Sequence, residues 1–338
     1  MNILLTAGSR RVPLVQAFRQ ALRSLRMPGA VIVTDVNPLS PAVHVADRAY
    51  HVPMSSDPDF LPELRGICET ERIGLIVPTI DDELPLMGRE RAQFAAEGIL
   101  VAASSESTAL LCNDKYETCR HLTAVGVPAA TSWLPGELPA ALLASEATLP
   151  LFIKPRGGRG AVSAFPVRTA EELAFFLSYV PDPVIQEYLD GPEFTLDVLC
   201  DSTGTPLSIV PRERVVIRAG VIDRGRTVND YRLIQLAQDV CTAIPFTGPI
   251  NIQCRIRGGQ PVVFEINPRF SGGIPLTIQA GADFPRMLVK LAAGQRVMPA
   301  IGQFRSDLWM TSFESSFFLD ASRVRFNGGS EPLLEEVA

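Results

Sequence analysis

The chain has 338 residues, of which 46% are hydrophobic and 20% charged, and its formal net charge is −6. This profile predicts a globular protein of two or three packed units and excludes a global attraction to nucleic acid or anionic lipid. No apolar run approaches the roughly 20 residues of a membrane span, and residues 1–11 lack the charge order of a signal peptide. We expect a soluble cytoplasmic protein that binds neither nucleic acid nor membranes.

The histidines and cysteines exclude several kinds of site. His44, His51 and His121 are the only histidines, which disfavours a histidine-rich metal site or a Ser-His-Asp triad in the C-terminal half. The six cysteines are scattered without a C-x-x-C pair, so we expect reduced thiols and neither a zinc site nor a disulfide framework. A metal would have to be bound through oxygen.

The first ~110 residues alternate short apolar runs with helical periodicity, which predicts βα units around a parallel sheet. A helix is expected over 12–25 and strands over 2–7, 30–36, 74–79 and 98–103. Asp35 and Asp81 lie at strand C-terminal ends, where ligands of open α/β sheets bind. The turn TAGSRR (6–11) could hold an anion at a helix N-terminus, although a tight turn with solvated arginines explains it equally well.

A glycine-rich loop follows the middle part of the chain. Residues 104–134 predict a capped helix and then a second helix that carries Lys115. The strand LFIKP (151–155) then ends in Lys154 and a loop with two arginines and three glycines, Arg156, Arg159, Gly157, Gly158 and Gly160. Glycines let backbone N–H groups approach phosphate oxygens, and the cations supply charge-assisted bonds. A flexible exposed hairpin is the alternative.

The next segments predict mixed strands and helices. Strands are expected over 183–189, 191–201, 206–220, 248–257 and 262–267, with helices over 169–180 and 230–244. Glu187 ends one of these strands and Glu193 follows in extended chain. The first carboxylate could accept the exocyclic amine of a purine, and the second could bind ribose hydroxyls. Surface glutamates beside a turn are common, so this signal is weak alone.

The segment VVFEINPRFSGG (262–273) ends a buried strand in two polar residues. Alternation places Glu265 and Asn267 on one face of the strand. The turn RGGQ (257–260) predicts a hairpin that sets Gln253 at the matching place on a neighbouring strand. Mg²⁺ prefers such oxygen ligands and commonly shares them with substrate phosphates. A hydrogen-bonded polar cluster under a turn is the alternative, and it explains a single residue better than the set.

These motifs together resemble the ATP-grasp superfamily. Lys115, Lys154 with its glycine loop, the segment QEYLDGPEF (186–194), and Gln253 followed by FEINPR (264–269) occur in that order and spacing. The Gln…Glu-x-Asn-Pro-Arg signature and the DK helix start resemble the synthetase units of carbamoyl phosphate synthetase. The N-terminal part resembles amino-acid ligases of the pyrrolysine-biosynthesis type. The resemblance covers about residues 1–295.

The resemblance implies a mixed α/β and α+β chain with an ATP-grasp fold. It implies a Rossmann-like (pre-ATP-grasp) domain over 1–112 and an ATP-grasp domain over 113–300, whose lid subdomain spans about 123–186. An edge strand and a polar tail would make up residues 301–338, with the strand over 309–320. ATP would lie between two α+β subdomains under the closing lid.

Site residues carry over from the family position by position. ATP would contact Lys115, Lys154, Gly157, Gly158, Gly160, Glu187, the Leu189 backbone and Glu193. Glu265, Asn267 and Gln253 would hold one or two Mg²⁺, with Mn²⁺ as an alternative. Many family members have a carboxylate at the position of Gln253, which makes a second metal less certain. Arg269 and Lys154 would stabilise the transferred phosphoryl group.

The substrate side of the site is less well defined. Arg218, Ser271, Gly272 and Asp81 are the candidates. Five arginines, Arg212, Arg214, Arg218, Arg224 and Arg226, occur in extended chain over 211–228. Three of them could form a carboxylate or phosphate clamp on one strand face, or the segment could be a solvated basic edge.

The sequence therefore predicts an ADP-forming carboxylate–amine ligase that acts through an acyl phosphate on small molecules, amino acids among them. Bicarbonate activation of the carbamoyl-phosphate kind is an alternative, disfavoured because a single synthetase unit is visible. A nucleotide-binding regulator without turnover is a second alternative, disfavoured by intact Lys154, Glu265 and Asn267. The oligomeric state is open, with a homodimer as one option.

Overall fold

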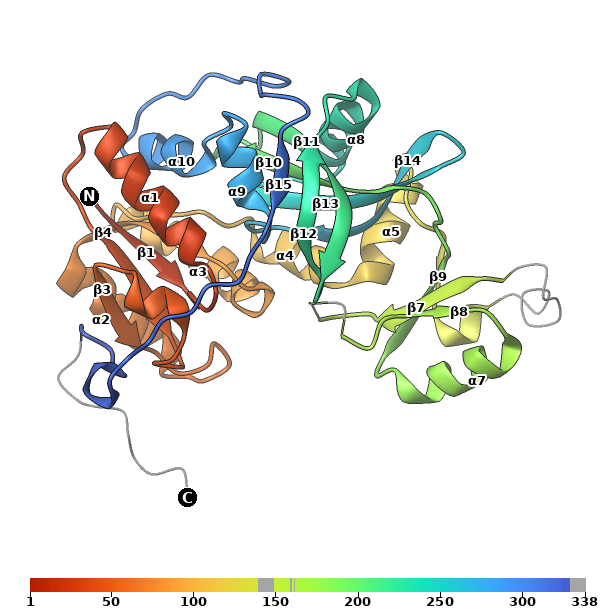
Figure 1. The fold of residues 1–338 in the computed structure, drawn as a ribbon, viewed down its shortest axis with the longest axis horizontal. Coiled ribbons are helices and arrows are strands. Elements are labelled where there is room, and N and C mark those ends of the chain that lie inside the picture. Colours follow the sequence, from red (N-terminus) through yellow and green to blue (C-terminus); the bar gives the residue numbers. More distant parts are fainter. Residues whose placement is uncertain (139–148, 159, 161, 329–338) are drawn as a thin grey trace.

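The computed structural model describes residues 1–138, 149–158, 160 and 162–328, and these form three β-sheets with flanking helices (Figure 1). The N-terminal sheet has the strand order β3-β2-β1-β4-β5, and every paired strand in it is parallel. Its strands are β1 (Asn2–Thr6), β2 (Val31–Asp35), β3 (Arg48–His51), β4 (Ile73–Pro78) and β5 (Leu100–Val101). Its helices are α1 (Val12–Ser24), α2 (Phe60–Glu71) and α3 (Leu84–Ala96). The predicted parallel βα architecture is confirmed.

The second sheet is antiparallel and supplies most of the site. Its strand order is β14-β13-β10-β11-β12-β15. These strands are β10 (Glu193–Cys200), β11 (Pro206–Arg218), β12 (Val221–Thr227), β13 (Gly248–Arg257), β14 (Gln260–Asn267) and β15 (Trp309–Thr311). Three helices pack on its apolar face: α4 (Glu106–Asn113), α5 (Lys115–Ala124) and α8 (Tyr231–Ala243). The opposite face is polar and open to the cavity described below.

A third, smaller unit stands apart on one side of the molecule (Figure 1). It is a four-stranded sheet in the order β6-β9-β7-β8, covered by α7 (Ala170–Tyr179). The strands are β6 (Ser132–Trp133), β7 (Leu151–Pro155), β8 (Phe165–Val167) and β9 (Pro183–Glu187). Phe165 stacks on Phe176 with ring centroids 4.4 Å apart, which joins helix and sheet. Its strands and helix lie between residues 132 and 187, the part of the chain for which a lid over 123–186 was predicted, and its role as a lid stays a prediction. Residues 139–148, 159 and 161 of that range lie outside the described part.

The N-terminal sheet and the antiparallel sheet share one hydrophobic core. The ring of Phe18 on α1 meets that of Phe270 edge to face at 6.1 Å, and α1 also packs on α10 (Phe284–Ala292). Between these, α9 (Ile274–Gln279) contributes Ile274 to the same core. A shared core holds the two units in a fixed relation. The domain boundary at residue 112 stays a prediction.

The C-terminal segment crosses from one unit to the other (Figure 1). It leaves β15, which covers only three of the twelve residues predicted as a strand, and reaches the N-terminal sheet. There Phe326 is buried, and the edge residue Ala49 donates its N–H to Asn327 Oδ1 and accepts from the N–H of Gly328. Residues 329–338 of the predicted tail lie outside the described part.

Two smaller findings complete the fold. Short 3-10 helices occur at Pro41–His44, Asp81–Glu83, Pro135–Glu137 and Ala321–Arg323. No helix within residues 1–138, 149–158 and 162–328 has the length and apolar character to cross a membrane.

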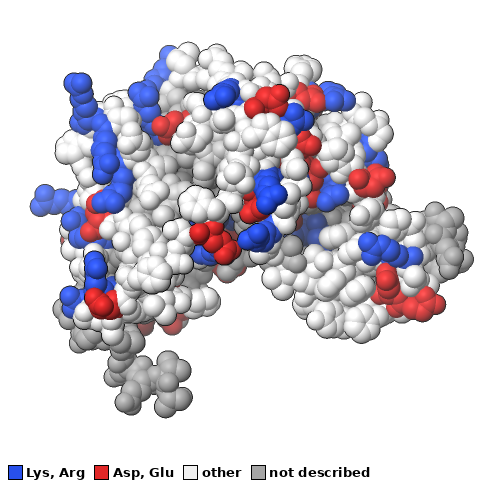
Figure 2. Space-filling model, in the orientation of Figure 1, with Lys and Arg blue, Asp and Glu red and all other residues white. Residues whose placement is uncertain are grey.

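The space-filling view shows the third, smaller unit as a separate lobe with a notch between it and the rest of the molecule (Figure 2).

Candidate functional site

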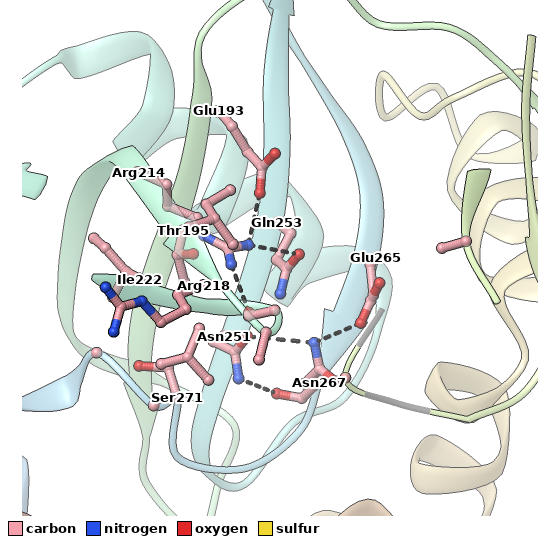
Figure 3. A pocket seen from close by; sticks show the side chains of 18 of the residues that line it. Glu193, Thr195, Arg214, Arg218, Ile222, Asn251, Gln253, Glu265, Asn267 and Ser271 are labelled. Carbon is pink, nitrogen blue, oxygen red and sulfur yellow. Dashed lines mark hydrogen bonds and ion pairs between the residues drawn. The ribbon is translucent and has the colours of Figure 1, made fainter. Parts of the chain in front are cut away.

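A cavity of about 1180 Å³ lies where the three sheets meet. Its wall combines the polar face of the antiparallel sheet, the glycine loop after β7 and the turn after β1. Figure 3 shows the polar side chains of β10, β11, β13 and β14 that point into it. A volume of this order accommodates a nucleotide and a small substrate together.

The strand register explains why these side chains meet. Gln253 on β13 is paired with both Thr195 on β10 and Glu265 on β14, so the three side chains form one row on the sheet face. Two residues along, Asn251 is paired with Asp197 and Asn267, which makes a second row on the same face. The intervening residues point to the apolar core. The predicted hairpin and the convergence of Gln253, Glu265 and Asn267 are confirmed.

Glu265 and Asn267 form a connected pair. The Asn267 amide donates to Glu265 Oε1 at 3.2 Å and to Asn251 Oδ1 at 3.3 Å (Figure 3). Asn251 in turn donates to the backbone oxygens of Asn267 and Arg269, at 3.3 and 3.1 Å. Asn251 was not predicted, although its place two residues before Gln253 on one strand could have indicated it. It fixes the end of β14 and the start of the following loop.

Gln253 is not free in this arrangement. Its Oε1 accepts from Arg214 Nη1 at 3.1 Å, and the same guanidinium is bound to Glu193 at 2.6 Å and to the Gly220 carbonyl at 2.6 Å. Asn267 is in the same situation, because its Oδ1 accepts from Arg269 Nη2 at 3.1 Å. An amide oxygen has two lone pairs, so each of these oxygens can keep its bond to a guanidinium and still offer a lone pair to a metal. Gln253, Glu265 and Asn267 all stay predicted ligands.

Glu193 is likewise engaged by two arginines. Besides Arg214, it accepts from Arg255 Nε at 3.1 Å, and its side chain is only 10% exposed. Arg255 also donates to the Leu189 carbonyl at 3.0 Å. Arg214 was predicted only as a member of the substrate clamp, and Arg255 was not predicted. The charged cluster ties β10, β11 and β13 to the chain segment beyond β9.

Lys154 is a buried cation next to the carboxylate of Glu265. It is 5% exposed, its Nζ donates to the Phe264 carbonyl at 3.2 Å, and it lies 5.2 Å from the centroid of the Phe264 ring. Burial lowers the pKa of Lys154, and the negative charge of Glu265 opposes this shift. A buried, incompletely paired ammonium group at the end of β7 is suited to bind an anion.

The glycine loop is anchored to the start of α5. Lys115, the first residue of α5, donates from Nζ to the Gly158 carbonyl at 2.8 Å, and its N–H donates to the Arg156 carbonyl at 3.0 Å. The helix cap Asp114 binds Arg156 at 2.7 Å. Gly158 and Gly160 have φ of 90° and 74°, which other residues rarely adopt. Gly157 lies beside them in the cavity wall, and Arg159 is outside the described residues.

The far edge of the cavity holds Glu187 and Leu189. One oxygen of Glu187 accepts from the Thr131 N–H at 2.8 Å, and the other contacts Arg257. The Leu189 carbonyl is bound by Arg255, whereas its N–H makes no hydrogen bond within the part of the chain that is described. The free N–H can recognise the edge of a heterocycle.

Arg269 connects the antiparallel sheet to the N-terminal sheet. Its Nη2 and Nε bind Asp81 Oδ2 at 2.8 and 3.0 Å, and Nη2 also donates to Asn267 Oδ1 at 3.1 Å. Both side chains are almost buried, at 12% and 10% exposure. Asp81 thus lies next to Arg269, and its predicted role as a substrate residue stays a prediction.

The three arginines predicted as a clamp on β11 all line the cavity but have different partners, and the clamp stays a prediction; the alternative of a solvated basic edge does not hold for the two inner members. Arg212 and Arg214 are buried in ion pairs with Asp197 and Glu193, while Arg218 is 66% exposed at the rim and pairs with Glu314 at 3.4 Å. A strand irregularity after Arg214 separates Arg218 from the inner pair. Arg224 and Arg226 lie on β12, where Arg226 pairs with Glu213.

The loop after β14 crosses the sheet end to reach Arg212. Arg212 Nη2 donates to Ser271 Oγ at 2.9 Å, which places Ser271 and Gly272 beside β12 in the cavity wall. Arg212 Nη1 is buried and has no hydrogen-bond partner among the described residues. This buried guanidinium forms part of the cavity wall and holds the loop through Ser271.

The donor set fits a magnesium ion that is shared with a nucleotide. The Glu265 carboxylate and the Asn267 amide lie together at the end of β14, with the amide nitrogen towards the carboxylate and the amide oxygen towards Arg269. The described residues contain no group of three or more His, Cys, Asp or Glu side chains able to enclose a metal. Mg²⁺ commonly takes one or two protein ligands and completes its shell with phosphate and water. The cavity therefore suits Mg²⁺ with a polyphosphate and not a metal held by protein alone.

Comparisons with known proteins agree with this geometry. Residues 3–102 match the family described as PylC-like, N-terminal domain, and residues 179–315 match ATP-grasp in the biosynthetic pathway with Ter operon. The arginine-specific carbamoyl phosphate synthase large chain of Bacillus subtilis is 25% identical over 293 residues, which is 81% of this chain and 27% of that protein. The chain thus spans about a quarter of the length of that relative.

Solved structures share the fold. The biotin carboxylase of Campylobacter jejuni, in complex with a β,γ-ATP compound, superposes with a TM-score of 0.71 over 91% of this chain and 74% of that one, at 17% identity. The L-amino acid ligase of Bacillus licheniformis gives a TM-score of 0.65 over 86% and 74% of the two chains, at 16% identity. The predicted ATP-grasp fold with a Rossmann-like N-terminal domain is confirmed.

Proposed function

Because the chain is a member of the ATP-grasp superfamily, we propose that it is an ADP-forming ligase that joins a small-molecule carboxylate to an amine. The observation that carries this proposal is the gathering of Lys154, Glu265 and Asn267 beside a glycine loop in one large cavity. Cations, oxygen ligands and flexible backbone donors are the groups that phosphoryl transfer requires. The relatives named as ligases and synthases support the same class of reaction.

The proposed reaction has two steps. A carboxylate oxygen attacks the γ-phosphorus of ATP, the bond from this phosphorus to the β–γ bridging oxygen breaks, and ADP leaves. The amine then attacks the acyl carbon, loses a proton, and displaces inorganic phosphate. No side-chain nucleophile is needed. Water must be kept from the acyl phosphate between the steps, which is a role for the lid and its glycine loop.

The residues divide this work between them. Lys115 and Lys154, with the backbone of Gly157, Gly158 and Gly160, would hold the phosphates. Lys115 would exchange its bond to the Gly158 carbonyl for one to a phosphate oxygen. The free Leu189 N–H, with Glu187 beside it, would recognise adenine, and Glu193 would meet the ribose while its arginines fix its position. Arg269 would face the transferred phosphoryl group.

Glu265 and Asn267 would hold Mg²⁺, which when bound supplies charge neutralisation on the phosphates. Their present hydrogen bond keeps the pair together without it. Gln253, whose Oε1 now accepts from Arg214, would be a third ligand, and Mn²⁺ is the alternative metal. Ser271, Gly272 and, at the rim, Arg218 line the substrate end of the cavity, and Asp81 lies behind them in its pair with Arg269.

The alternatives remain distinct in what they predict. Bicarbonate activation would need no organic carboxylate, and its support is the similarity to carbamoyl phosphate synthase chains. A regulator without turnover would bind nucleotide and release no product. The intact set of Lys154, Glu265 and Asn267 favours turnover over that reading.

The test is ADP and phosphate release from Mg-ATP against pools of amino acids and other small carboxylates, with and without amines. Bicarbonate plus ammonia is assayed separately. Release that needs both a carboxylate and an amine supports the proposal, and release with bicarbonate alone supports the first alternative. Nucleotide binding without release in any pool would contradict the ligase.

Glu265→Gln gives the matching variant. It keeps the shape of the side chain and removes its charge, so we expect turnover to fall by about 10²- to 10³-fold with folding unchanged. Glu63→Gln, the same change on the exposed surface of α2, is the control and should behave as the wild type. Full activity in Glu265→Gln would remove the case for magnesium at this carboxylate.

A further inference from the structure

The turn after β1 brings an arginine into the cavity that makes no ion pair within the described residues. Arg11 ends this turn and lines the cavity together with Ser9 and Arg10. Its Nη2 donates to the Thr79 carbonyl at 3.1 Å, and no carboxylate among the described residues lies within ion-pair distance of it. The side chain is half-buried, so part of the guanidinium still faces the cavity.

The turn holds this arginine rigidly. Ala7 and Ser9 have φ of 48° and 43°, an unusual conformation for residues other than glycine. The N–H of Ser9 donates to Asp35 Oδ2 at 2.6 Å, and a Cβ on Gly8 would lie 2.4 Å from Val33. The fixed backbone sets where the Arg11 side chain starts, and its bond to the Thr79 carbonyl holds the guanidinium at the cavity.

A second guanidinium lies close by. Arg269 and Asp81 are near enough to act on Arg11 electrostatically, and burial together with the charge of Arg269 lowers the pKa of Arg11 to about 10. Asp81 is the carboxylate that Arg269 already binds. The positive charges of Arg11 and Arg269 are thus opposed by the single negative charge of Asp81, at a place where water screens charges only weakly. An uncompensated positive charge of this kind is unfavourable in the empty cavity.

Arg11 differs in this respect from the cavity arginines of the antiparallel sheet. Arg212 is bound by Asp197, and Arg214 and Arg255 share Glu193. Arg218 is exposed and pairs with Glu314. Each of these four has a protein carboxylate within reach, whereas Arg11 lines the same cavity and the only hydrogen-bond partner of its side chain among the described residues is the Thr79 carbonyl.

We propose that Arg11 is a substrate-binding residue which, with Arg269, holds an anionic group of the substrate, a carboxylate or a phosphate, at the end of the cavity formed by the N-terminal sheet. The inference rests on the proposed function, because it names the charge of the substrate of that same site. The anion would lie between the N-terminal sheet and the antiparallel sheet. Its negative charge would neutralise the positive charge of Arg11 and Arg269 that Asp81 alone does not balance.

The test compares Arg11→Met with Arg23→Met. Arg23 lies in the last turn of α1, the helix that begins directly after Arg11, and it is exposed and outside the cavity wall. Both variants therefore lose one positive charge, from opposite ends of this helix. Acetate and inorganic phosphate are titrated separately at constant ionic strength against each protein saturated with Mg-ADP. The unfolding temperature reports binding.

The expected result is stabilisation of the wild type and of Arg23→Met by the anion. Arg11→Met should bind it about 10- to 100-fold more weakly, as expected for the loss of charge-assisted hydrogen bonds. A stronger effect with acetate identifies a carboxylate group, and a stronger effect with phosphate identifies a phosphate group. Equal affinities in all three proteins would overturn the proposal.

The unliganded variant separates binding from a structural role. Arg11→Met removes a cation next to Arg269, so we expect it to unfold at a temperature equal to or above that of the wild type. A lower unfolding temperature with unchanged affinity for both anions would assign Arg11 to structure alone. If Mg-ADP fails to stabilise the wild type, the proposed function is contradicted, and the same titrations without nucleotide still decide the role of Arg11.

Discussion

Lys154 shows how a functional side chain can lower stability. Its ammonium group is buried against Phe264, and its pKa is lowered by desolvation. Lys154→Met should therefore raise the stability at neutral pH by about 1 kcal/mol or more, while ATP turnover is lost. Unfolding by urea and ADP release measure the two effects. Lys290→Met on α10, outside the cavity wall, is the control and should change neither by much.

The gain in stability of Lys154→Met over the wild type should become smaller as the pH rises. Because the folded-state pKa lies below the ordinary value of 10.5, the unfolded chain binds more protons between these two values. The stability of the wild type therefore rises with pH through this window, and the difference from Lys154→Met shrinks towards pH 10.5. A constant difference up to that pH would show that burial of the charge is not the cause.

The sequence predicted some of the side-chain contacts in the site and not others, and the difference has a physical reason. Glu265, Asn267 and Gln253 could be placed on one face because strand alternation and a tight hairpin fix their relation. The guanidinium groups of Arg214 and Arg255 reach across strands through long side chains, so their pairing with Glu193 depends on the order β13-β10-β11. That order is set by chain segments up to 60 residues apart and is not visible in local spacing.

The loop from Pro268 to Gly273 depends on close packing at one glycine. A Cβ on Gly273 would lie 2.3 Å from Arg212 Nη1 and 2.4 Å from Ile222 Cγ2. Arg212 is fixed by two bonds to Asp197 and cannot yield. Gly273→Ala should therefore displace the loop, lower the free energy of unfolding by about 1–3 kcal/mol and weaken substrate binding.

Gly66→Ala serves as the control for that change. Gly66 lies inside α2 with no atom within 4 Å of an added Cβ, so alanine there should stabilise the protein by up to about 1 kcal/mol. Urea unfolding of both variants gives the comparison. Equal stability of Gly273→Ala and the wild type would mean that the loop accommodates the methyl group and that Arg212 does not hold it rigidly.

Elements were predicted well where they are long and periodic. The helix at 12–25 and the strands at 183–189 and 248–257 agree with α1, β9 and β13. The strand β3 was missed because its four residues, RAYH, carry little apolar character and are stabilised as an edge by pairing with β2. The strand predicted over 309–320 ends at Thr311, since the residues after it leave the sheet for the N-terminal unit.

At the scale of the whole molecule, the resemblance predicted the units but not the connection between them. The C-terminal segment from Ser312 to Gly328 passes over the cavity, where Ser312 and Glu314 line the rim, and ends on the outer strand of the N-terminal sheet. Such a connection arises from pairing between residues about 280 positions apart, for example Ala49 with Asn327. It joins the two units whose relative position defines the substrate end of the cavity.

Phe326 is the anchor of this connection. It is 4% exposed in the core shared by the two units, and its ring meets that of His51 at 5.8 Å. Phe326→Ala should lower the free energy with which this segment docks on the N-terminal sheet by about 3–5 kcal/mol. The loss cannot exceed the free energy at which the wild-type segment detaches by itself. Phe318→Ala is the control, because Phe318 lies on the same segment and is 92% exposed.

The amide of Ala49 reports detachment directly, since its N–H donates to Asn327 Oδ1 at 2.6 Å. Hydrogen exchange at Ala49 should be about a hundredfold faster in Phe326→Ala and unchanged in Phe318→Ala. Mg-ADP binding should stay near the wild-type value, because the nucleotide end of the cavity is built from the antiparallel sheet and the lid. Anion binding near Arg11 should weaken, because the N-terminal sheet then loses one of its attachments to the antiparallel sheet and keeps those through α1, α9 and α10. Unchanged protection of Ala49 in Phe326→Ala would show that the backbone pairing holds the segment without its aromatic anchor, and the relative position of the two units would then depend on the shared core around Phe18 and Phe270.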